Sequence, residues 1–250
     1  MPRKDLSSYT HQHRHFYTDT LQPLLLETAT DNQGGVVAEL GVGDGSILWA
    51  LEERGLLGEV AYAVDLSADR VARAEQVSPK IRGVVADATH VVELPDGAVD
   101  GVLVSQVIEH LEDDRALAPE IARLLKPGGW WYVGTIVRGC RAWWIYRVDG
   151  RWQVDPTHVR EYRSEGELLS ALAHPELCVG DVRTTPLRFP VLDLALRAAA
   201  AVRIVAHDSL SAAYVRRPRL LDARRLRIRV PGYRLLEVCG SKVDESAVSA

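Results

Sequence analysis

A glycine-spaced turn follows the first predicted strand and has the composition of a ligand-binding loop. It reads ELGVGDGS, with Glu39 ahead of Gly41, Gly43 and Gly45. A turn that binds a dinucleotide reads GxGxxG, whereas here the third glycine comes one place early and Ser46 occupies its expected position. A carboxylate at the strand end would repel a pyrophosphate but can pair with a cation. The turn is therefore predicted to hold a cationic ligand without phosphate.

Two further carboxylates stand at the ends of the next predicted strands. Asp65 ends the second strand, about where a carboxylate accepts both hydroxyls of a ribose. Asp87 ends the third strand, where its side chain or the following amide can meet the amino edge of an adenine. Together with Glu39, these acids favour a nucleoside that carries positive charge. S-adenosyl-L-methionine (SAM) has that description.

The elements that must position these acids alternate between short apolar, β-branched runs and segments of helical period. Strands are predicted at residues 36–40, 60–66, 83–88, 99–107 and 130–137. Helices are predicted at residues 46–55, stopped by Gly55, at 67–77, capped by Ser67, and at 115–129, closed by Pro127 and Gly128. Strands that are apolar throughout and followed by helices indicate a parallel sheet covered on both faces.

The pattern changes after residue 137. The long, aromatic and charged stretch that follows has no clean period, which predicts a loop that roofs the site. Ser164 and Glu167 form a capping box for a short helix. Two closing strands are predicted at residues 177–188 and 232–242. A helix at residues 190–210 is predicted to be inserted between them as a lid. The predicted fold is thus α/β, a Rossmann-like, doubly wound, seven-stranded and mostly parallel sheet with a helical lid near the C-terminus.

We expect a single domain with four parts. These are an N-terminal helical cap, a SAM-binding core, a segment with the roof, lid and closing strands, and a tail, at residues 1–35, 36–137, 138–242 and 243–250.

Composition excludes several classes of protein. The formal net charge of −4 and the pI near 6.1 argue against a dedicated nucleic-acid binder. The cysteines, Cys140, Cys178 and Cys239, are odd in number and form no CxxC pair, so neither a disulfide framework nor a zinc site is indicated. The chain shows no signal peptide and no apolar run long enough to span a membrane. We expect a soluble, cytoplasmic protein.

Five motifs in order resemble those of class I SAM-dependent methyltransferases of the UbiE/UbiG-like, type 11 group: ELGVGDG, VDLS, VADA, SQVIEHLED and LLKPGGWW. They cover roughly residues 36–137, and the later stretch DPTHVREYRSEGEL resembles the segment that follows the fifth strand in many members. The resemblance implies SAM as the cofactor.

The resemblance also implies roles for individual residues around that cofactor. The methionine part would lie against Glu39, Gly41, Gly43 and Gly45, the ribose and adenine against Asp65 and Leu66, and the adenine rim against Asp87 and Ala88. Ser105 and Gln106 would lie near the sulfonium.

Methyl transfer to a hydroxyl also needs a base, and histidine is the side chain that titrates nearest neutral pH. His110, in VIEHL, is one candidate, with a helix-cap or scaffold role as the alternative. His158, beside Asp155 in DPTHVREY, is a second, as a catalytic group or as one that holds the roof loop. The predicted catalytic set is therefore His158, His110 and Asp155.

A metal site is a further question raised by the same motif. Small-RNA 2′-O-methyltransferases and some ubiquinone-pathway O-methyltransferases show ExxEH after the fourth strand and bind a divalent metal with those side chains. Here the stretch is QVIEH: Gln106 replaces the first carboxylate, Glu109 and His110 remain, and His158 is a candidate further ligand. Because loss of an acidic ligand weakens a site for a hard cation, we expect no metal.

The acceptor and partners are indicated only by composition. Aromatic residues gather in the roof, as packing or as a pocket for a ring-bearing acceptor: Trp143, Trp144, Tyr146 and Trp152. Residues 183–234 carry twelve arginines against three aspartates, which favours an acidic or phosphate-linked acceptor. The helix at 190–210, by default solvated or part of an interface, could also contact a membrane surface or a second copy of the chain.

The sequence thus predicts a SAM-dependent methyltransferase that O-methylates a small molecule, such as a phenol, a sugar or a polyketide, of secondary or cell-envelope metabolism. The alternatives are a lipid or quinone methyltransferase docked on a membrane, an RNA methyltransferase, which the acidic charge and Gln106 disfavour, and a SAM-binding protein without turnover.

Overall fold

The computed structural model describes residues 21–140, 142, 146–148, 151–153, 155, 157–192, 223 and 226–244, with only the backbone of 146–148 and 151–153. The first part of the predicted cap, most of the predicted lid, Trp143, Trp144 and the end of the tail therefore lie outside the described residues.

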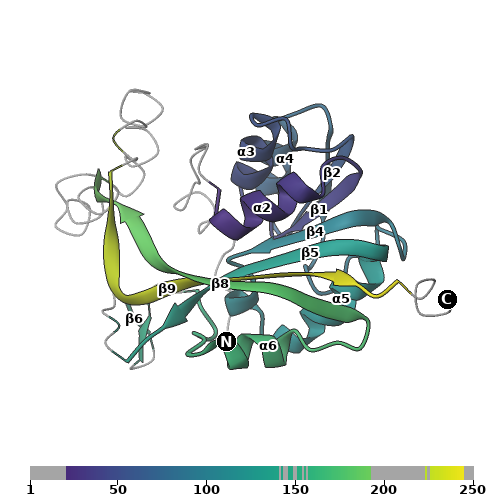
Figure 1. Ribbon diagram of the computed structural model, residues 1–250. Helices are drawn as coiled ribbons and strands as arrows, with labels where there is room; N and C mark the ends of the chain where they lie inside the picture. Colours follow the sequence, from purple (N-terminus) through teal and green to yellow (C-terminus); the bar gives the residue numbers. More distant parts are fainter. Residues whose placement is uncertain are drawn as a thin grey trace.

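A seven-stranded sheet forms the centre of the molecule (Figure 1). Its strands are β1 (Val36–Leu40), β2 (Val60–Asp65), β3 (Ile81–Val85), β4 (Val99–Ser105), β5 (Leu125–Arg138), β8 (Leu177–Pro190) and β9 (Arg227–Lys242). Their order is β3-β2-β1-β4-β5-β9-β8. The first five strands are parallel, and β9 is antiparallel to both of its neighbours. This confirms the predicted doubly wound, mostly parallel sheet.

Helices cover both faces of this sheet (Figure 1). One face packs against α2 (Pro23–Asp31), α3 (Ser46–Glu52) and α4 (Ala68–Glu75), the other against α5 (Leu117–Leu124) and α6 (Glu165–Ala171). The neighbouring residues Trp131 and Tyr132 are both fully buried, one in each core, because successive side chains of a strand point to opposite faces. The sheet therefore has two hydrophobic cores.

The predicted helix caps are present in part. Ser67 Oγ accepts a hydrogen bond from Arg70 N at 3.4 Å at the start of α4. Ser164 Oγ accepts one from Glu167 N at 3.2 Å, but the Glu167 carboxylate bonds Arg163 N rather than Ser164 N. The box at α6 is therefore only half formed.

Helix α2 is tied to the last strand by a buried carboxylate. Glu237 of β9 accepts hydrogen bonds from Leu24 N at 3.0 Å, Leu25 N at 3.4 Å and the hydroxyl of Tyr132 at 3.2 Å. The first N–H groups of a helix have no partner inside it, so this carboxylate serves as their acceptor. Helix α2 is thereby fixed over β5 and β9.

The third strand ends two residues before Asp87, which corrects its predicted span. Strand β3 stops at Val85 because its partner there, Asp65, ends β2. Asp87 instead forms a turn in which its Oδ1 accepts hydrogen bonds from the amide and hydroxyl of Thr89, at 2.9 and 2.7 Å. The fourth strand likewise ends at Ser105 rather than at Val107.

The helix predicted at 115–129 is also shorter than expected. A 3₁₀ turn, η2 (Asp114–Ala116), precedes α5, and α5 ends at Leu124. Leu125 already belongs to β5, where it pairs with Val99, since the residue before Pro127 is disfavoured in a helix.

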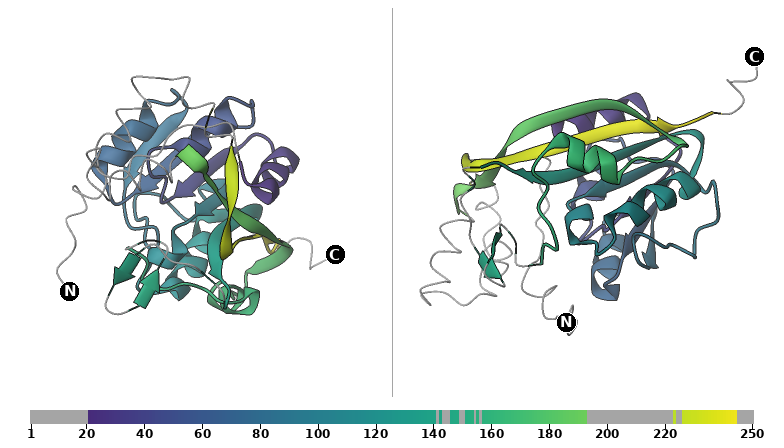
Figure 2. Two further views of the ribbon diagram at one scale, coloured as in Figure 1. Left: turned by 90° about the vertical axis from the view of Figure 1, so that its left-hand side faces the viewer. Right: turned by 90° about the horizontal axis from the view of Figure 1, so that it is seen from below.

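The predicted roof loop contains a short hairpin that the sequence reading missed. Strand β6 (Tyr146–Val148) pairs antiparallel with β7 (Arg151–Gln153). The closing strands β8 and β9 were predicted correctly but are longer, and their hairpin extends beyond the parallel strands (Figure 2). Among the described residues, no helix has both the length and the apolar composition needed to cross a bilayer.

Candidate active site

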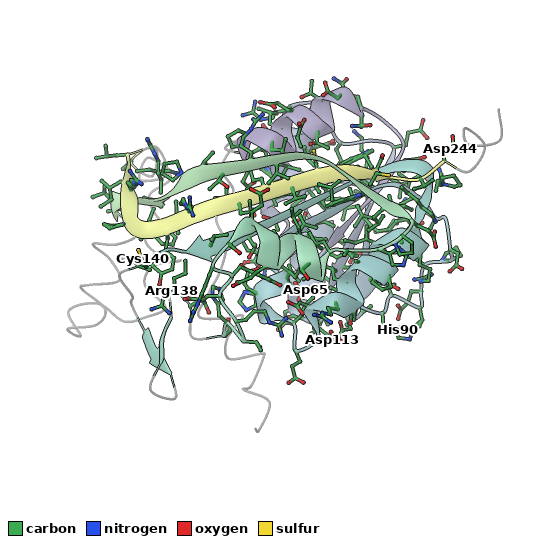
Figure 3. The ribbon with its side chains drawn as sticks, turned by 60° about the horizontal axis from the view of Figure 1, so that its bottom comes forward. Asp65, His90, Asp113, Arg138, Cys140 and Asp244 are labelled. Atoms are coloured by element: carbon green, nitrogen blue, oxygen red, sulfur yellow. The ribbon has the colours of Figure 1, made fainter. Side chains whose placement is uncertain are left out.

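The carboxyl ends of the parallel strands share one side of the sheet. Arg138, at the end of β5, and Asp244, just past antiparallel β9, lie at opposite sides of the molecule and mark the two ends of the strands (Figure 3). Ligands of open α/β sheets bind beyond the carboxyl ends of the strands. The predicted residues Glu39, Gly41, Gly43, Gly45 and Asp65 meet at this side, and we call them the cofactor edge.

The glycine turn is held against both neighbouring strands. The amides of Gly41 and Val42 donate to Val64 O at 2.8 and 2.9 Å, which joins the turn to the end of β2. Gly41 has a φ of +75°, and a Cβ at this position would lie 2.3 Å from Cγ2 of Val107. Only glycine combines that backbone conformation with so close an approach.

Asp65 is the acid that organises the turn. Its Oδ2 accepts a hydrogen bond from Gly43 N at 3.0 Å and its Oδ1 accepts one from Ser67 N at 2.9 Å. The side chain of Arg70 lies 3.9 Å from Oδ2. The residue is only 8% exposed. Asp65 therefore links the glycine turn to the start of α4, and its contact with a ribose stays a prediction.

Glu39 is a buried acid without full compensation. Among the described residues, nothing hydrogen-bonds its Oε2, and the side chain is 2% exposed. Burial, and then the negative charge of Asp65, raise the pKa of Glu39 well above its usual value. A cation placed beside this carboxylate would favour its ionised form. The cofactor edge therefore suits a positively charged ligand, and SAM carries both an ammonium and a sulfonium.

The residues predicted for the adenine side are mixed. Leu66 is 59% exposed and follows directly on β2, so its side chain is available to a ring. Ala88 is buried, whereas Asp87 is exposed and its carboxylate is engaged by Thr89. Two of the three predicted acids, rather than all three, thus stand at the end of a strand.

Ser105 is the last residue of β4 and Gln106 follows it directly, and their place near the sulfonium stays a prediction. Ser105 Oγ accepts a hydrogen bond from Gln22 Nε2 at 3.4 Å, a contact across 83 residues that sequence patterns do not signal. Gln106 has a φ of +58° and is the one non-glycine residue with positive φ in the part of the chain that the structure describes. Its buried Nε2 has no described partner. Backbone strain of this kind concentrates at functional sites.

A second cluster lies just after β4, where a returning segment packs on a 3₁₀ turn. The turn is η1 (Ile108–His110), and the segment, residues 157–163, is called the strap. The amides of Val159 and Arg160 donate to Glu109 O at 3.0 and 3.3 Å. These contacts hold the strap against η1 by its backbone.

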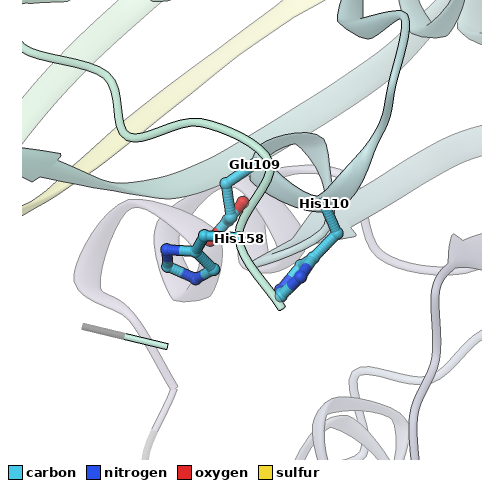
Figure 4. Close-up of side chains that lie close together, drawn as sticks. All are labelled: Glu109, His110 and His158. Atoms are coloured by element: carbon cyan, nitrogen blue, oxygen red, sulfur yellow. The ribbon is translucent and has the colours of Figure 1, made fainter. Parts of the chain in front are cut away.

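The strap brings together three predicted residues, Glu109, His110 and His158, which we call the acceptor cluster (Figure 4). Each offers a ligand atom, and these atoms lie within 4.8 Å of one another. The two rings meet edge to face with their centroids 4.8 Å apart. Glu109 is 1% exposed, and among the described residues neither of its carboxylate oxygens has a hydrogen-bond partner.

The two histidines of the acceptor cluster titrate differently. Burial lowers the pKa of His110, an effect only partly opposed by the charge of Glu109. Burial also acts on His158, but the Glu161 carboxylate, 3.7 Å from Nδ1, and the charges of Glu109 and Asp155 outweigh it and raise the pKa of His158. Neighbouring groups whose pKa values are pushed apart can serve as base and acid.

Asp155 joins this cluster through a residue that the sequence reading overlooked. Its Oδ1 accepts hydrogen bonds from the amide of Thr157 at 2.8 Å and from its hydroxyl at 2.6 Å. The same hydroxyl oxygen lies 3.0 Å from His110 Nδ1. The spacing Asp-x-Thr is typical of a side-chain-closed turn, which is the signal that could have pointed to Thr157.

Comparison with known proteins relates the chain to methyltransferases. Residues 38–133 match the family described as "Methyltransferase domain". A malonyl-[acyl-carrier protein] O-methyltransferase of Marinomonas sp. is 31% identical over 58% of this chain and 54% of its own length. A ubiquinone biosynthesis O-methyltransferase of Paracidovorax citrulli is 26% identical over 52% of this chain and 56% of its own length. The chain thus spans about half the length of these two relatives.

The fold is shared with solved structures as well. The YcgJ protein of Bacillus subtilis superposes with a TM-score of 0.61 and 18% identity, over 88% of this chain and 97% of that one. The family match covers the strands from β1 to the middle of β5, including the glycine turn, Asp65 and the acceptor cluster's η1. Residues 38–133 therefore match the methyltransferase-domain family, and the chain shares its fold with that solved structure.

Proposed function

We propose that this chain catalyses methyl transfer from SAM to an oxygen atom of a small-molecule acceptor. The observation that carries this proposal is the placement of His110 just after β4, with a ring nitrogen within 4.8 Å of the buried carboxylate of Glu109. Burial lowers the pKa of this histidine, which favours its neutral form. A neutral imidazole just past the carboxyl end of β4, on the side of the sheet where the cofactor edge lies, is suited to deprotonate a hydroxyl.

The cofactor edge would bind SAM through Glu39, the glycine turn and Asp65. SAM supplies a methyl group on a sulfonium, whose carbon–sulfur bond breaks as the bond to the acceptor oxygen forms. The chain's own residues then have two tasks. They must hold the acceptor oxygen in line with that bond, and they must remove its proton.

His110 would take that proton. The imidazolium formed would lie beside Glu109, whose negative charge raises the pKa of His110 and so stabilises the charged ring. His158, with its raised pKa, would remain the more readily protonated of the two rings and could hydrogen-bond the acceptor. Because Glu109 has no described hydrogen-bond donor, it is free to serve this charge.

We propose oxygen as the methylated atom because of the names of the relatives. The proposed class of acceptor is based on two arginines of β8 and β9. Both relatives described above are named as O-methyltransferases. In the hairpin, Arg188 lies directly opposite Arg229, and both are exposed. Like charges in this position repel, so an anionic group between them would be stabilising. We therefore favour an acceptor that carries an acidic group as well as a hydroxyl or carboxyl oxygen.

The test is a methyl-transfer screen with a binding control. Calorimetric titration with SAM and with S-adenosylhomocysteine establishes whether the cofactor edge binds. Formation of S-adenosylhomocysteine is then followed against phenols, hydroxy acids and acyl-carrier thioesters, for the wild type and for His110→Ala. Turnover that requires His110 supports the proposal. Binding without turnover against every acceptor, or methylation of carbon or nitrogen, contradicts it.

The orphaned carboxylate of Glu109 supports a second candidate, an oxygen methyltransferase assisted by a divalent metal. The sequence led us to expect no metal, yet one carboxylate and two imidazoles within reach of each other suit several transition metals. Glu109, His110 and His158 would be the ligands, and the metal would lower the pKa of a bound hydroxyl. Metal analysis of the purified protein before and after chelation, with Glu109→Gln as comparison, decides between the two candidates.

A further inference from the structure

The hydroxyl of Thr157 stands between a carboxylate and an imidazole, and it has a single proton. Its oxygen lies 2.6 Å from Asp155 Oδ1 and 3.0 Å from His110 Nδ1. A hydroxyl can donate to only one of these two groups, and toward the other it can only accept. The position of this proton therefore decides whether the Thr157 oxygen donates to Nδ1 of His110 or accepts from it.

The distances assign the proton to the bond with Asp155. A separation of 2.6 Å is the length of a hydroxyl-to-carboxylate hydrogen bond, and two oxygens so close with no proton between them would repel. The same Oδ1 also accepts the amide of Thr157 at 2.8 Å, so it acts as an acceptor toward both groups. Burial opposes ionisation of Asp155, but these two hydrogen bonds, together with the charges of His158 and His110, lower its pKa, which favours the ionised carboxylate.

It follows that the Thr157 oxygen faces His110 with a lone pair. Nδ1 of His110 must then carry the hydrogen, and in the neutral ring Nε2 has the free lone pair. A hydrogen bond to one ring nitrogen generally fixes the tautomer of a histidine in this way.

We propose that Asp155, acting through Thr157, holds His110 in the tautomer protonated on Nδ1, so that Nε2 is the nitrogen that accepts a proton from the acceptor. Asp155 and Thr157 are positioning residues, since they act through His110. The tautomer follows from the contacts alone, and only the use of Nε2 as a base rests on the proposed function.

The strap is fixed firmly enough to hold this arrangement. Its backbone donates twice to Glu109 O, and the Arg160 guanidinium lies 2.8 Å from Asp114. The hydroxyl of Tyr162 donates to the same Asp114 carboxylate at 2.7 Å. Two side chains of the strap thus contact one acid, the first residue of η2, and Thr157 faces His110 at the strap's other end.

The tautomer is measured directly by nuclear magnetic resonance. Full-length protein labelled with ¹⁵N in histidine is treated with a chelator and studied at a pH where the ring of His110 is neutral. Long-range proton–nitrogen correlations then show which ring nitrogen is protonated, and loss of one set in His110→Gln assigns the signals. We expect a protonated Nδ1 and an unprotonated Nε2. A ring protonated on Nε2 in the wild type overturns the inference.

Three variants test the cause. Thr157→Val keeps the shape but removes the hydroxyl, and Asp155→Ala keeps the hydroxyl but frees its proton for Nδ1. Both should shift His110 toward the Nε2-protonated form. Thr157→Ser keeps the hydroxyl and should restore the wild-type signals, which a purely structural role for Thr157 would not require. Wild-type tautomers in both Thr157→Val and Asp155→Ala would overturn the inference.

Activity separates this inference from the proposed function. Loss of an outer partner of a functional histidine costs roughly 10–100-fold, so Thr157→Val should lower kcat by about that factor while the Kd for SAM stays unchanged. If the tautomer shifts as expected but kcat does not fall, then the inferred link between Asp155 and His110 stands and the role of His110 as base is wrong.

Discussion

The two halves of the site are built from different kinds of contact. At the cofactor edge, Asp65 accepts hydrogen bonds from the amides of Gly43 and Ser67, which are 22 and 2 positions away in the sequence. In the acceptor cluster, Glu109 has no described donor, and the contact between His110 and Thr157 joins residues 47 positions apart. A carboxylate satisfied by backbone amides supports the scaffold, whereas one left buried without donors is suited to a charge that arrives with a ligand or a reaction.

The sharpest test of this difference is the loss of His110. We expect His110→Gln to lower kcat by about 10²–10⁴-fold, the usual effect of removing a general base, with the Kd for SAM unchanged. Initial rates of S-adenosylhomocysteine formation measure the effect. His174→Gln is the matched control, because His174 bonds Glu176 N beyond α6 and should have wild-type kinetics. If the variant without His110 keeps the full kcat, the acceptor cluster does not take part in the reaction as proposed.

The cofactor edge should respond to Asp65→Ala in binding. We propose that Asp65 accepts hydrogen bonds from the ribose. Since hydrogen bonds to a charged group are worth about 1.5–3 kcal/mol each, its loss should weaken SAM binding by about 100-fold, or about 3 kcal/mol. Calorimetry gives the Kd. Asp87→Ala is the comparison, because its exposed carboxylate is bonded to Thr89 and its loss should change the Kd only a few-fold. Equal effects of the two substitutions on the Kd would mean that Asp65 does not bind the ribose.

Glu39 should make SAM binding depend on pH. The pKa of Glu39 is raised in the folded protein. This group therefore lowers the free energy of unfolding as pH rises from its unfolded pKa to its folded pKa, and above the folded pKa the loss stays constant. A cationic ligand favours the ionised form, so binding should release a proton and weaken as pH falls through the folded pKa. Calorimetry in buffers of different ionisation enthalpy detects that proton.

Glu39→Gln separates the two effects of that charge. The variant should release no proton on binding SAM, should bind SAM about tenfold more weakly, on the order of one charged hydrogen bond, and should raise the Tm of the unliganded protein at neutral pH. A lower Tm in this variant would mean that the carboxylate stabilises the turn, and the placement of the cation beside it would be wrong.

The smallest expected effect concerns the close packing of the glycine turn. Gly97→Ala places a side chain at a φ of +63° with nothing within 4 Å of its Cβ, and should cost about 1–2 kcal/mol. Gly41→Ala adds a clash with Val107 and should lower Tm about twice as far, at roughly 2–4 °C per kcal/mol. Thermal unfolding of both variants checks this. Equal losses would mean that the turn is not closely packed on the end of β4.

Much of the fold was predictable where the sequence marks its own boundaries. Strands β1 and β2 were predicted almost to the residue, because buried apolar runs there end in an acid or a glycine. The third strand was displaced, since Asp87 looks like a strand end but belongs to a turn. The prediction extended helix α5 too far, because the apolar period of the helix continues into Leu125. In the structure, Leu125 pairs with Val99 and is the first residue of β5.

In the site, the residues of local motifs could be predicted, whereas those that come from distant segments could not. Glu39 and the glycines belong to one motif and Asp65 ends the next strand of the parallel sheet, so their convergence was foreseeable. Thr157 and Gln22 contact the site only because the chain returns to it from far away. The convergence of Glu109, His110 and His158 was raised by the family resemblance, and periodicity alone could not place the strap against η1.

The buried carboxylate of Glu237 has a consequence for how the molecule is made. It is the acceptor for the first amides of α2, which precede it by 213 and 212 residues. During translation, α2 leaves the ribosome early but finds its final anchor only when β9 has emerged. A nascent chain that stops short of β9 therefore leaves α2 without this acceptor, so a helix made early is completed by a strand made more than 200 residues later.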